Sequence, residues 1–135
     1  MQRHSQKLWN AYKTTRFQWL EAEPLWTRFA IITAWNPRSR VTPASINKTR
    51  QSVLMHRLSE EGIKYRHILA GNPDFSYSEA SLAVRTDKVM AALLCQELEQ
   101  NAYFWVQEGE LTLLPVMFDL AGAAHLGAFQ DRVQT

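Results

Sequence analysis

The chain has 135 residues, of which 46% are hydrophobic and 21% are charged, with a formal net charge of +2 at pH 7 and one cysteine. This length is typical of one domain, whose folding buries roughly 70% of the surface that the unfolded chain exposes. One cysteine excludes an internal disulfide, and no stretch of the sequence approaches the roughly 18 apolar residues of a membrane helix. The N-terminal residues are too polar for a signal peptide, so we expect a soluble, cytoplasmic protein with no membrane contact.

The charges are unevenly distributed along the chain. Residues 1–70 carry twelve Lys or Arg and four Asp or Glu, whereas residues 71–135 carry three and nine. The stretch between Pro37 and Leu58 holds five basic side chains and no acidic one: Arg38, Arg40, Lys48, Arg50 and Arg57. Two interpretations fit this bias. The two halves attract one another within the fold, or the basic stretch meets an anionic partner.

The first predicted elements are a helix and a central strand. Ser5–Tyr12 is predicted to form a short helix that covers one face of the core. Phe17–Pro24 lacks a clear period and ends in proline, which predicts an irregular segment. Phe29–Trp35 is a short run of β-branched and aromatic residues, typical of a strand that is buried on both faces. Pro37 ends this strand, because its ring removes a hydrogen-bond donor and holds Asn36 in an extended or turn conformation.

A long helix is predicted to follow this strand. The Thr42 hydroxyl caps it, Pro43 lies in its first turn, and Gly62 ends it. Its apolar side, extended backwards at helical spacing, includes four residues: Asn47, Gln51, Leu54 and Leu58. The first part of the buried side is therefore polar, and Asn47 should point towards the sheet.

The remaining elements are strands around one further helix. In chain order we first expect a strand at Lys64–Ala70, a loop with aromatic residues at Phe75–Ala80 and a strand at Ser81–Arg85. A helix capped by Thr86 or Asp87 should follow. The last expected elements are a strand at Tyr103–Val106, a turn at Glu108-Gly109 and a strand at Leu111–Val116. The helix should bury a stripe formed by Val89, Met90, Leu93, Leu94 and Leu98. Asn101 suits a left-handed cap after this helix, and 119–135 should form a short helix or loop laid on the body.

The order strand, helix, strand, strand, helix, strand matches the ferredoxin-like split β-α-β plait. The predicted fold is therefore α+β, a plait with an added C-terminal hairpin strand and an N-terminal helix. We expect a single domain, with a lead-in over 1–28, an α/β core over 29–116 and a tail packed on the core over 117–135. In this topology Phe29–Trp35 and Tyr103–Val106 are neighbouring central strands. Four polar segments then lie at one end of the sheet: Asn36-Pro37-Arg38, Asn47, Gly71–Glu79 and Gln100-Asn101.

Several of these residues resemble the sequence pattern of a bacterial domain family of unknown function, DUF3293. The shared motifs are Thr33-Ala34-Trp35-Asn36-Pro37, the spacing of Asn47, Leu54 and Leu58, Glu79-Ala80-Ser81 and Gln100-Asn101-Ala102. The resemblance runs from about Tyr12 to Val116, and this chain has Tyr77 near a position where the family often has tryptophan. It implies one domain and marks the polar positions, but it implies no activity.

An anion site at the start of the long helix is the first chemical hypothesis. Free backbone N–H groups and the positive end of the helix dipole favour an anion there, and Arg38, Arg40 or Arg50 can add charge-assisted hydrogen bonds. A solvated basic face that balances the acidic half of the chain explains the same residues. No glycine-rich phosphate loop accompanies them.

The polar end also offers an amide cluster and one carboxylate. Asn36, Asn47, Gln100 and Asn101 can orient a polar ligand, or they can simply brace turns and caps, because amides are poor acids, bases and nucleophiles. Glu79 can act as a general acid or base if it is desolvated, or it can pair with an arginine. Tyr77 is an aromatic loop residue that can stack on a base or sugar.

Three functions follow from these residues. The first is binding of a small anionic or nucleotide-like ligand at the polar end of the sheet by Asn36, Arg38, Asn47, Arg50, Tyr77, Gln100 and Asn101. The second is an enzyme in which Glu79 is the catalytic acid or base. The third is nucleic-acid binding by the surface from Arg38 to Arg57, which is less favoured because the strands are too apolar to offer a stacking platform. The histidines show no metal-ligand spacing, so we expect no metal and no cofactor, and the sequence does not predict an oligomeric state.

Overall fold

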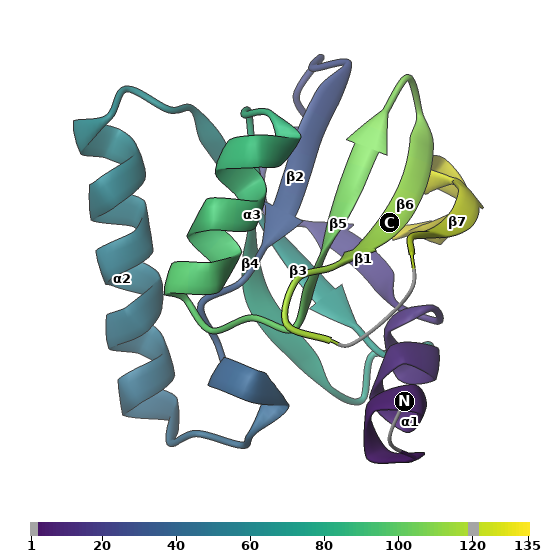
Figure 1. Ribbon diagram of the computed structural model, residues 1–135. Coiled ribbons are helices and arrows are strands. Elements are labelled where there is room, and N and C mark those ends of the chain that lie inside the picture. Colours follow the sequence, from purple (N-terminus) through teal and green to yellow (C-terminus); the bar gives the residue numbers. More distant parts are fainter. Residues whose placement is uncertain (1–2, 119–121) are drawn as a thin grey trace.

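The computed structural model describes residues 3–118 and 122–135 (Figure 1). Over these residues the chain forms three α-helices and an eight-stranded curled sheet. The elements run in the order α1 (Arg3–Tyr12), β1 (Arg16–Trp19), β2 (Arg28–Ile32), α2 (Ala44–Glu60), β3 (Tyr65–Gly71), β4 (Ser78–Val84), α3 (Lys88–Glu97), β5 (Ala102–Gln107), β6 (Glu110–Pro115), β7 (Ala124–Ala128) and β8 (Val133–Gln134). Two short 3₁₀ helices, η1 (Pro37–Ser39) and η2 (Phe129–Arg132), complete them. None of the described helices is both long and apolar enough to cross a bilayer.

Strand β2 lies in the middle of the sheet, as its apolar sequence predicts. The strands follow the order β7-β6-β5-β2-β4-β3-β1-β8, and every pairing is antiparallel except that of β1 with β8. Phe29 is opposite Val106 on one side of β2, and Ile31 is opposite Ala83 on the other. The prediction that Phe29–Trp35 and Tyr103–Val106 are neighbouring central strands is therefore confirmed, although β2 ends at Ile32.

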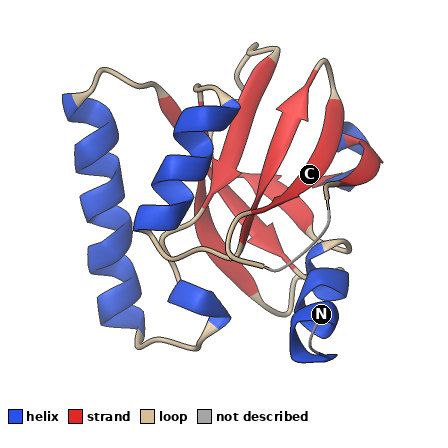
Figure 2. Cartoon of the chain, viewed as in Figure 1, coloured by secondary structure: helices blue, strands red, loops and turns tan. Residues whose placement is uncertain are grey.

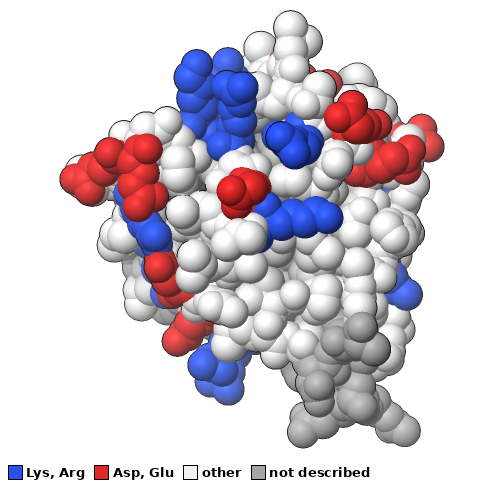
Figure 3. All heavy atoms as spheres, turned by 45° about the horizontal axis from the view of Figure 1, so that its top comes forward, with Lys and Arg blue, Asp and Glu red and all other residues white. Residues whose placement is uncertain are grey.

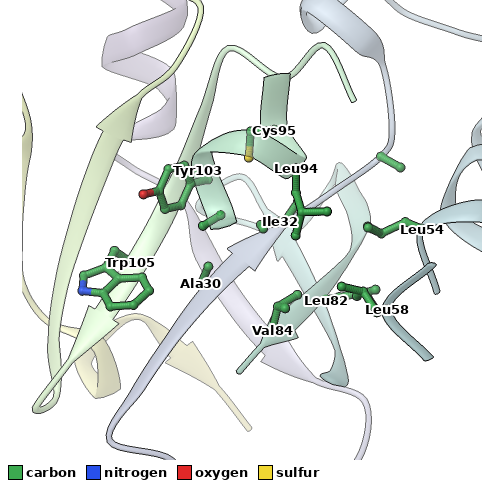
Figure 4. Packing of buried hydrophobic residues seen from close by; sticks show 12 residues of the cluster. Ala30, Ile32, Leu54, Leu58, Leu82, Val84, Leu94, Cys95, Tyr103 and Trp105 are labelled. Carbon is green, nitrogen blue, oxygen red and sulfur yellow. The ribbon is translucent and has the colours of Figure 1, made fainter. Parts of the chain in front are cut away.

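Helices α2 and α3 cover one face of the sheet (Figure 2). Their contact with β2, β4 and β5 is a buried cluster whose labelled members in Figure 4 are Ala30, Ile32, Leu54, Leu58, Leu82, Val84, Leu94, Cys95, Tyr103 and Trp105. The opposite face carries a second cluster, rich in aromatic side chains, which is covered by α1 and the end of the chain. Phe17, Phe104 and Phe129 meet there, with ring centroids 5.1 Å and 5.4 Å from Phe17. Burial on both faces explains why the central strands read as continuous apolar runs.

Two segments expected to be irregular are strands. The first residues of Phe17–Pro24 belong to β1, which pairs with β3. This pairing holds Phe17 fully buried in the aromatic cluster. The described part of the tail forms β7 at one edge of the sheet and β8 at the other, joined by η2. Residues 119–121 of the predicted tail lie outside the described residues. These short strands are specified by distant partners, which a local sequence pattern does not reveal.

The helices begin and end close to their predicted boundaries, but two details of their caps were wrong. The N-cap of α2 is Pro43, and the Thr42 hydroxyl donates to the Arg40 carbonyl at 3.0 Å instead of capping the helix. Helix α3 does begin at Asp87, whose carboxylate accepts from the Met90 N–H at 2.8 Å. The residue in the left-handed conformation after α3 is Glu99, with φ 55°, and not Asn101.

The stripe predicted for α3 was right in part, because Met90, Leu94 and Leu98 pack in the helix-covered cluster and the other two residues do not. Val89 is 73% exposed and Leu93 is 46% exposed, and the buried residues are Ala91, Leu94 and Cys95. Small side chains at the first and last of these positions let the helix lie close to the sheet. The predicted stripe was chosen from the large apolar residues alone. It is therefore rotated around the helix axis by part of a turn relative to the side of α3 that is buried.

Candidate functional site

The chain leaves β2 through a turn with an unusual backbone. Asn36, Arg38 and Ser39 have φ angles of 48°, 58° and 59°, a conformation that residues other than glycine adopt rarely. The first of them is an asparagine, which tolerates this region better than most side chains do. Three such residues within one short turn indicate that surrounding contacts hold the backbone in place, a pattern that is concentrated at functional sites.

Asn36 is the centre of these contacts and is only 8% exposed. Its Oδ1 accepts from the Asn47 amide at 2.9 Å and from the Thr42 N–H at 3.0 Å, and its own N–H donates to Asn47 Oδ1 at 2.9 Å. Its Nδ2 donates to the Tyr77 hydroxyl at 2.7 Å. The side chain therefore joins α2, on one face of the sheet, to the loop before β4, and both Oδ1 lone pairs are already used.

Glu79 lies beside this amide. It is the second residue of β4, so the prediction of a loop at Phe75–Ala80 was wrong in its last part. The Tyr77 hydroxyl donates to Glu79 Oε2 at 2.9 Å, and Asn36 Nδ2 approaches the same oxygen at 3.5 Å. Burial raises the pKa of the Glu79 carboxyl, and these two hydrogen bonds offset part of that increase. Both contacts go to Oε2, so among the described residues Oε1 has no hydrogen-bond donor.

A cavity of about 350 Å³ opens next to this carboxylate. It lies between α1, the aromatic face of the sheet and the turn after β2, which are at the lower end of Figure 1. Its polar wall is formed by Thr33, Asn36, Ser39, Tyr77, Glu79 and Gln100, and its apolar wall by Leu8, Ile31, Val41, Ala70, Ala102 and Phe104. Among the described residues that line it, Glu79 is the only charged one. Such a cavity suits a ligand with an apolar body and a few polar groups.

A second set of hydrogen bonds closes the cavity on the side of α1. The hydroxyls of Tyr12 and Ser39 are 2.6 Å apart, and the Asn101 amide donates to Ser39 Oγ at 2.8 Å. Burial raises the pKa of Tyr12, so it stays protonated and can donate this hydrogen bond. Gln100 Nε2 donates to the Trp35 carbonyl at 2.9 Å. These bonds fix the turn between β2 and α2 against both α1 and β5.

The structure brings the predicted polar end together but divides its residues into two groups. Asn36, Tyr77, Glu79 and Gln100 line the cavity. Asn47 and Asn101 support the turn from behind and are not part of the cavity wall. The prediction that Asn47 points towards the sheet is confirmed by its 2% exposure, and its contacts are those of a brace, which is the second of the two roles expected for the amide cluster.

The arginines predicted for an anion site do not reach the cavity. Arg50 donates to the carbonyls of Ala34 and Leu98 at 2.7 Å and 2.6 Å. Arg38 forms an ion pair with Glu99, with 3.5 Å between Nε and Oε2. The Thr42 N–H at the helix start is taken by Asn36. Arg38 and Arg50 thus contact an acidic group and carbonyls of the protein itself, whereas Arg40 is exposed and forms none of the ion pairs among the described residues.

The basic run from Arg38 to Arg57 is also largely used within the fold. Besides the pair of Arg38 with Glu99, Arg57 forms an ion pair with Glu97 at the end of α3. Both pairs join the basic half of the chain to the acidic half, which is the first of the two interpretations of the charge bias. With Arg50 bound to two carbonyls, three of the five cations of this run make contacts within the fold and are less available to a nucleic acid.

Three residues of the site were not selected from the sequence. Tyr12 and Ser39 are 27 positions apart, and no local pattern indicates that α1 covers the turn. Thr33 donates from its hydroxyl to the Ala80 carbonyl at 2.7 Å, and its place in the Thr33–Pro37 motif was the one available signal. Within the described residues no group of three His, Cys, Asp or Glu side chains is arranged to hold a metal ion. Cys95 is buried in the helix-covered core, and this burial raises its pKa to about 12.

Comparison with protein families gives one match. The family model DUF3293, described as a protein of unknown function, matches residues 32–103. The matched segment begins at the last residue of β2 and ends inside β5, so it includes Asn36, Asn47, Tyr77 and Glu79. The comparisons with curated proteins and with solved structures found no significant match.

Proposed function

The chain belongs to the DUF3293 family, and we propose that it binds a small molecule in the cavity beside Glu79. The observation that carries this proposal is the carboxylate itself, which is half-buried in the wall of an otherwise uncharged cavity and has one oxygen without a hydrogen-bond donor among the described residues. A ligand that fills the cavity would remove water from this carboxylate, which would then need a hydrogen-bond donor or a cation from the ligand as its partner. We therefore infer a ligand that presents an amine or another donor to Glu79 Oε1.

The other wall defines the body of this ligand. Ile31 and Phe104 are almost fully buried at the floor of the cavity, and Leu8 of α1 forms part of its roof. Removing apolar ligand surface from water there contributes roughly 25 cal/mol per Å². A ring-sized apolar group with a donor at one end fits both walls. A phosphate or carboxylate group does not fit, because it would approach Glu79 with no described cation on the wall to offset the repulsion.

A set of three matched fragments tests this ligand class. Benzylamine, benzyl alcohol and benzoate share a ring but differ in charge, and each is added to the protein in a thermal-shift experiment at pH 8. Benzylamine should raise the melting temperature most and benzoate least, because the amine presents a positive charge to Glu79 and benzoate presents a negative one. A ligand at 100 times its dissociation constant adds about 2.7 kcal/mol to the free energy of unfolding. Glu79→Gln should remove the preference for the amine. A larger shift with benzoate would refute the proposal.

Catalysis by Glu79 is the second candidate function. Burial raises the pKa of this carboxyl towards neutrality, as general acids and bases require, and the Tyr77 hydroxyl fixes one of its oxygens. The other oxygen then faces the cavity, where a proton on the ligand would lie. Binding and catalysis are distinguished by Glu79→Asp, which keeps the charge but withdraws the carboxylate by one methylene: binding should weaken modestly, whereas a proton transfer should slow by orders of magnitude.

We also propose that the core of the sheet is a ferredoxin-like split β-α-β plait with additions at both edges. Support comes from the order β5-β2-β4-β3, with antiparallel neighbours and with α2 and α3 on one face. The hairpin strand β6 and the short strands β7, β1 and β8 extend this core. An experimental structure compared strand by strand with plait proteins tests the assignment.

A further inference from the structure

The end of the sheet opposite to Glu79 carries a second, open depression of about 780 Å³. It is formed where the chain enters β2, where it passes from β4 to α3, and where β5 ends, at the top of Figure 1. Its lining residues are Leu25, Trp26, Thr27, Arg28, Arg85, Thr86, Asp87, Lys88, Val89, Trp105 and Gln107. We call it the basic groove.

Three cations line the basic groove without partners. Arg28, Arg85 and Lys88 are all exposed, and none of the ion pairs among the described residues includes them. The acid in the lining is Asp87, whose Oδ1 already accepts from the Met90 N–H at 2.8 Å. Figure 3 shows this face of the molecule, with Lys and Arg side chains gathered on its upper part and acidic side chains beside them. The groove therefore has an excess of positive charge that no described acid neutralises by direct contact.

Apolar side chains stand next to these cations. Trp26 is half-buried and packs its ring on Phe29, with centroids 6.3 Å apart, while the Arg66 guanidinium carbon lies 5.7 Å from the ring centre. Leu25, the preceding residue, is 99% exposed. Trp105 is buried at the base of the groove, with Lys88 Nζ at 5.8 Å from its ring centre. The part of Trp26 that lines the groove offers an apolar surface for a base, and the three cations offer positive charges for phosphates.

We propose that the basic groove binds single-stranded nucleic acid. The groove is open to solvent, which suits an extended strand better than a small ligand that needs enclosure. Arg28, Arg85 and Lys88 would follow the phosphates, and Trp26 with Leu25 would contact one base. The faces of the sheet do not compete for this role, because α2 and α3 cover one and the aromatic cluster fills the other.

Fluorescence anisotropy with labelled oligo(dT) and oligo(U) of about twelve nucleotides tests the proposal. With three phosphate contacts, the logarithm of the binding constant should fall against the logarithm of the salt concentration with a slope of about −2. The triple variant Arg28→Ala, Arg85→Ala, Lys88→Ala should lose at least tenfold in affinity and most of this slope. Trp26→Ala should lose about tenfold with the slope unchanged, because stacking does not release counterions.

A matched variant removes the same charge elsewhere. Lys7, Arg40 and Lys48 are exposed and belong to α1 and to the segment that begins α2, at the other end of the molecule, so Lys7→Ala, Arg40→Ala, Lys48→Ala should keep near-normal affinity. If Trp26→Ala lowers the melting temperature, Leu25→Ala replaces it, since that side chain is fully exposed and its loss cannot disturb the core. The proposal is overturned by absence of binding, by equal losses in the matched variant, or by free TMP and UMP competing as well as the oligomers do.

Discussion

The polar side chains at the two ends of the sheet differ in how far they are bonded within the protein. At the end beside Glu79, Asn36 uses both lone pairs of its side-chain oxygen, and hydrogen bonds fix the surrounding turn on every side. At the other end Arg28, Arg85 and Lys88 are exposed and have no ion-pair partners among the described residues. Polar residues at the first end thus maintain the shape of a cavity, whereas those at the second contribute charge and little structure. Substitutions should therefore affect stability at one end and ionic interactions at the other.

Asn36→Ala should have the largest effect on stability. It removes the acceptor of the Thr42 N–H and one of the two acceptors of the Asn47 amide, and it places alanine at φ 48°. We expect a loss of roughly 3 kcal/mol in the free energy of unfolding, measured by urea denaturation, and a decrease of about 10 °C in the melting temperature. At the other end Gln107→Ala, which removes the acceptor of the Trp105 indole, should cost less than about 1 kcal/mol.

Two further variants separate the causes of this loss. Asn36→Gly removes the side chain but accepts the left-handed backbone, so it should recover about 1 kcal/mol relative to alanine. Asn47→Ala should cost roughly 1 to 3 kcal/mol alone and much less when Asn36 is already alanine, since the two amides form one unit. Additive losses would mean that the two amides act independently, and the comparison of the two ends would then lose its main support.

Gly71→Ala should be next in size. A Cβ added at Gly71 would lie 2.9 Å from the Tyr77 carbonyl oxygen and 3.0 Å from the Phe75 ring, so the loop that holds Tyr77 beside Glu79 has to shift. The expected loss is about 1 to 3 kcal/mol, as for other overpacked sites, together with a weaker benzylamine shift. Gly122→Ala is the matched control, because nothing lies within 4 Å of its added Cβ and it should stay within about 0.5 kcal/mol of the parent protein.

These local contacts explain which parts of the structure the sequence predicted. The β2 strand, the hairpin at Glu108-Gly109 and the shared end of Asn36, Glu79 and Asn101 follow from short-range patterns and from the order of elements. A pattern within a few residues specifies such features, and the topology then brings them together.

The parts that the sequence did not predict depend on long-range contacts. Arg16 donates to Gln134 Oε1 at 2.8 Å across 118 positions, where β1 and β8 pair at the edge of the sheet. The cavity exists because α1 reaches the turn after β2, and that contact is again made between residues distant in sequence, Tyr12 and Ser39. Neither short strands nor a covering helix leave a periodic signal that identifies their partner. The contacts of Arg38 with Glu99 and of Arg50 with two carbonyls are likewise made between distant parts of the chain, so the sequence could not show them.

The pH dependence of Glu79→Gln should be smaller than the effects above but specific to the cavity. Burial places the folded pKa of Glu79 above its unfolded value, so the folded state binds the proton more tightly. The stability from this group is fully present below the unfolded pKa and is lost as the pH rises through the folded pKa. Glutamine does not titrate, so the melting temperature of the variant minus that of the parent should increase with pH across this window. A difference that falls with rising pH would show that Glu79 is stabilised as the anion.

The smallest effect on stability is expected for the cations of the basic groove. The side chains of Arg28, Arg85 and Lys88 are exposed and form none of the ion pairs among the described residues, so their replacement by alanine leaves no buried group unpaired. Each single variant should unfold within about 0.5 kcal/mol of the parent protein at moderate salt. Repulsion among neighbouring cations is screened over about 10 Å at 0.1 M salt, so at low salt the triple variant should instead become slightly more stable than the parent. Melting curves at two salt concentrations measure both effects. A loss of stability in the triple variant that persists at both would mean that these side chains hold the fold together, and the contrast between the two ends of the sheet would then be wrong.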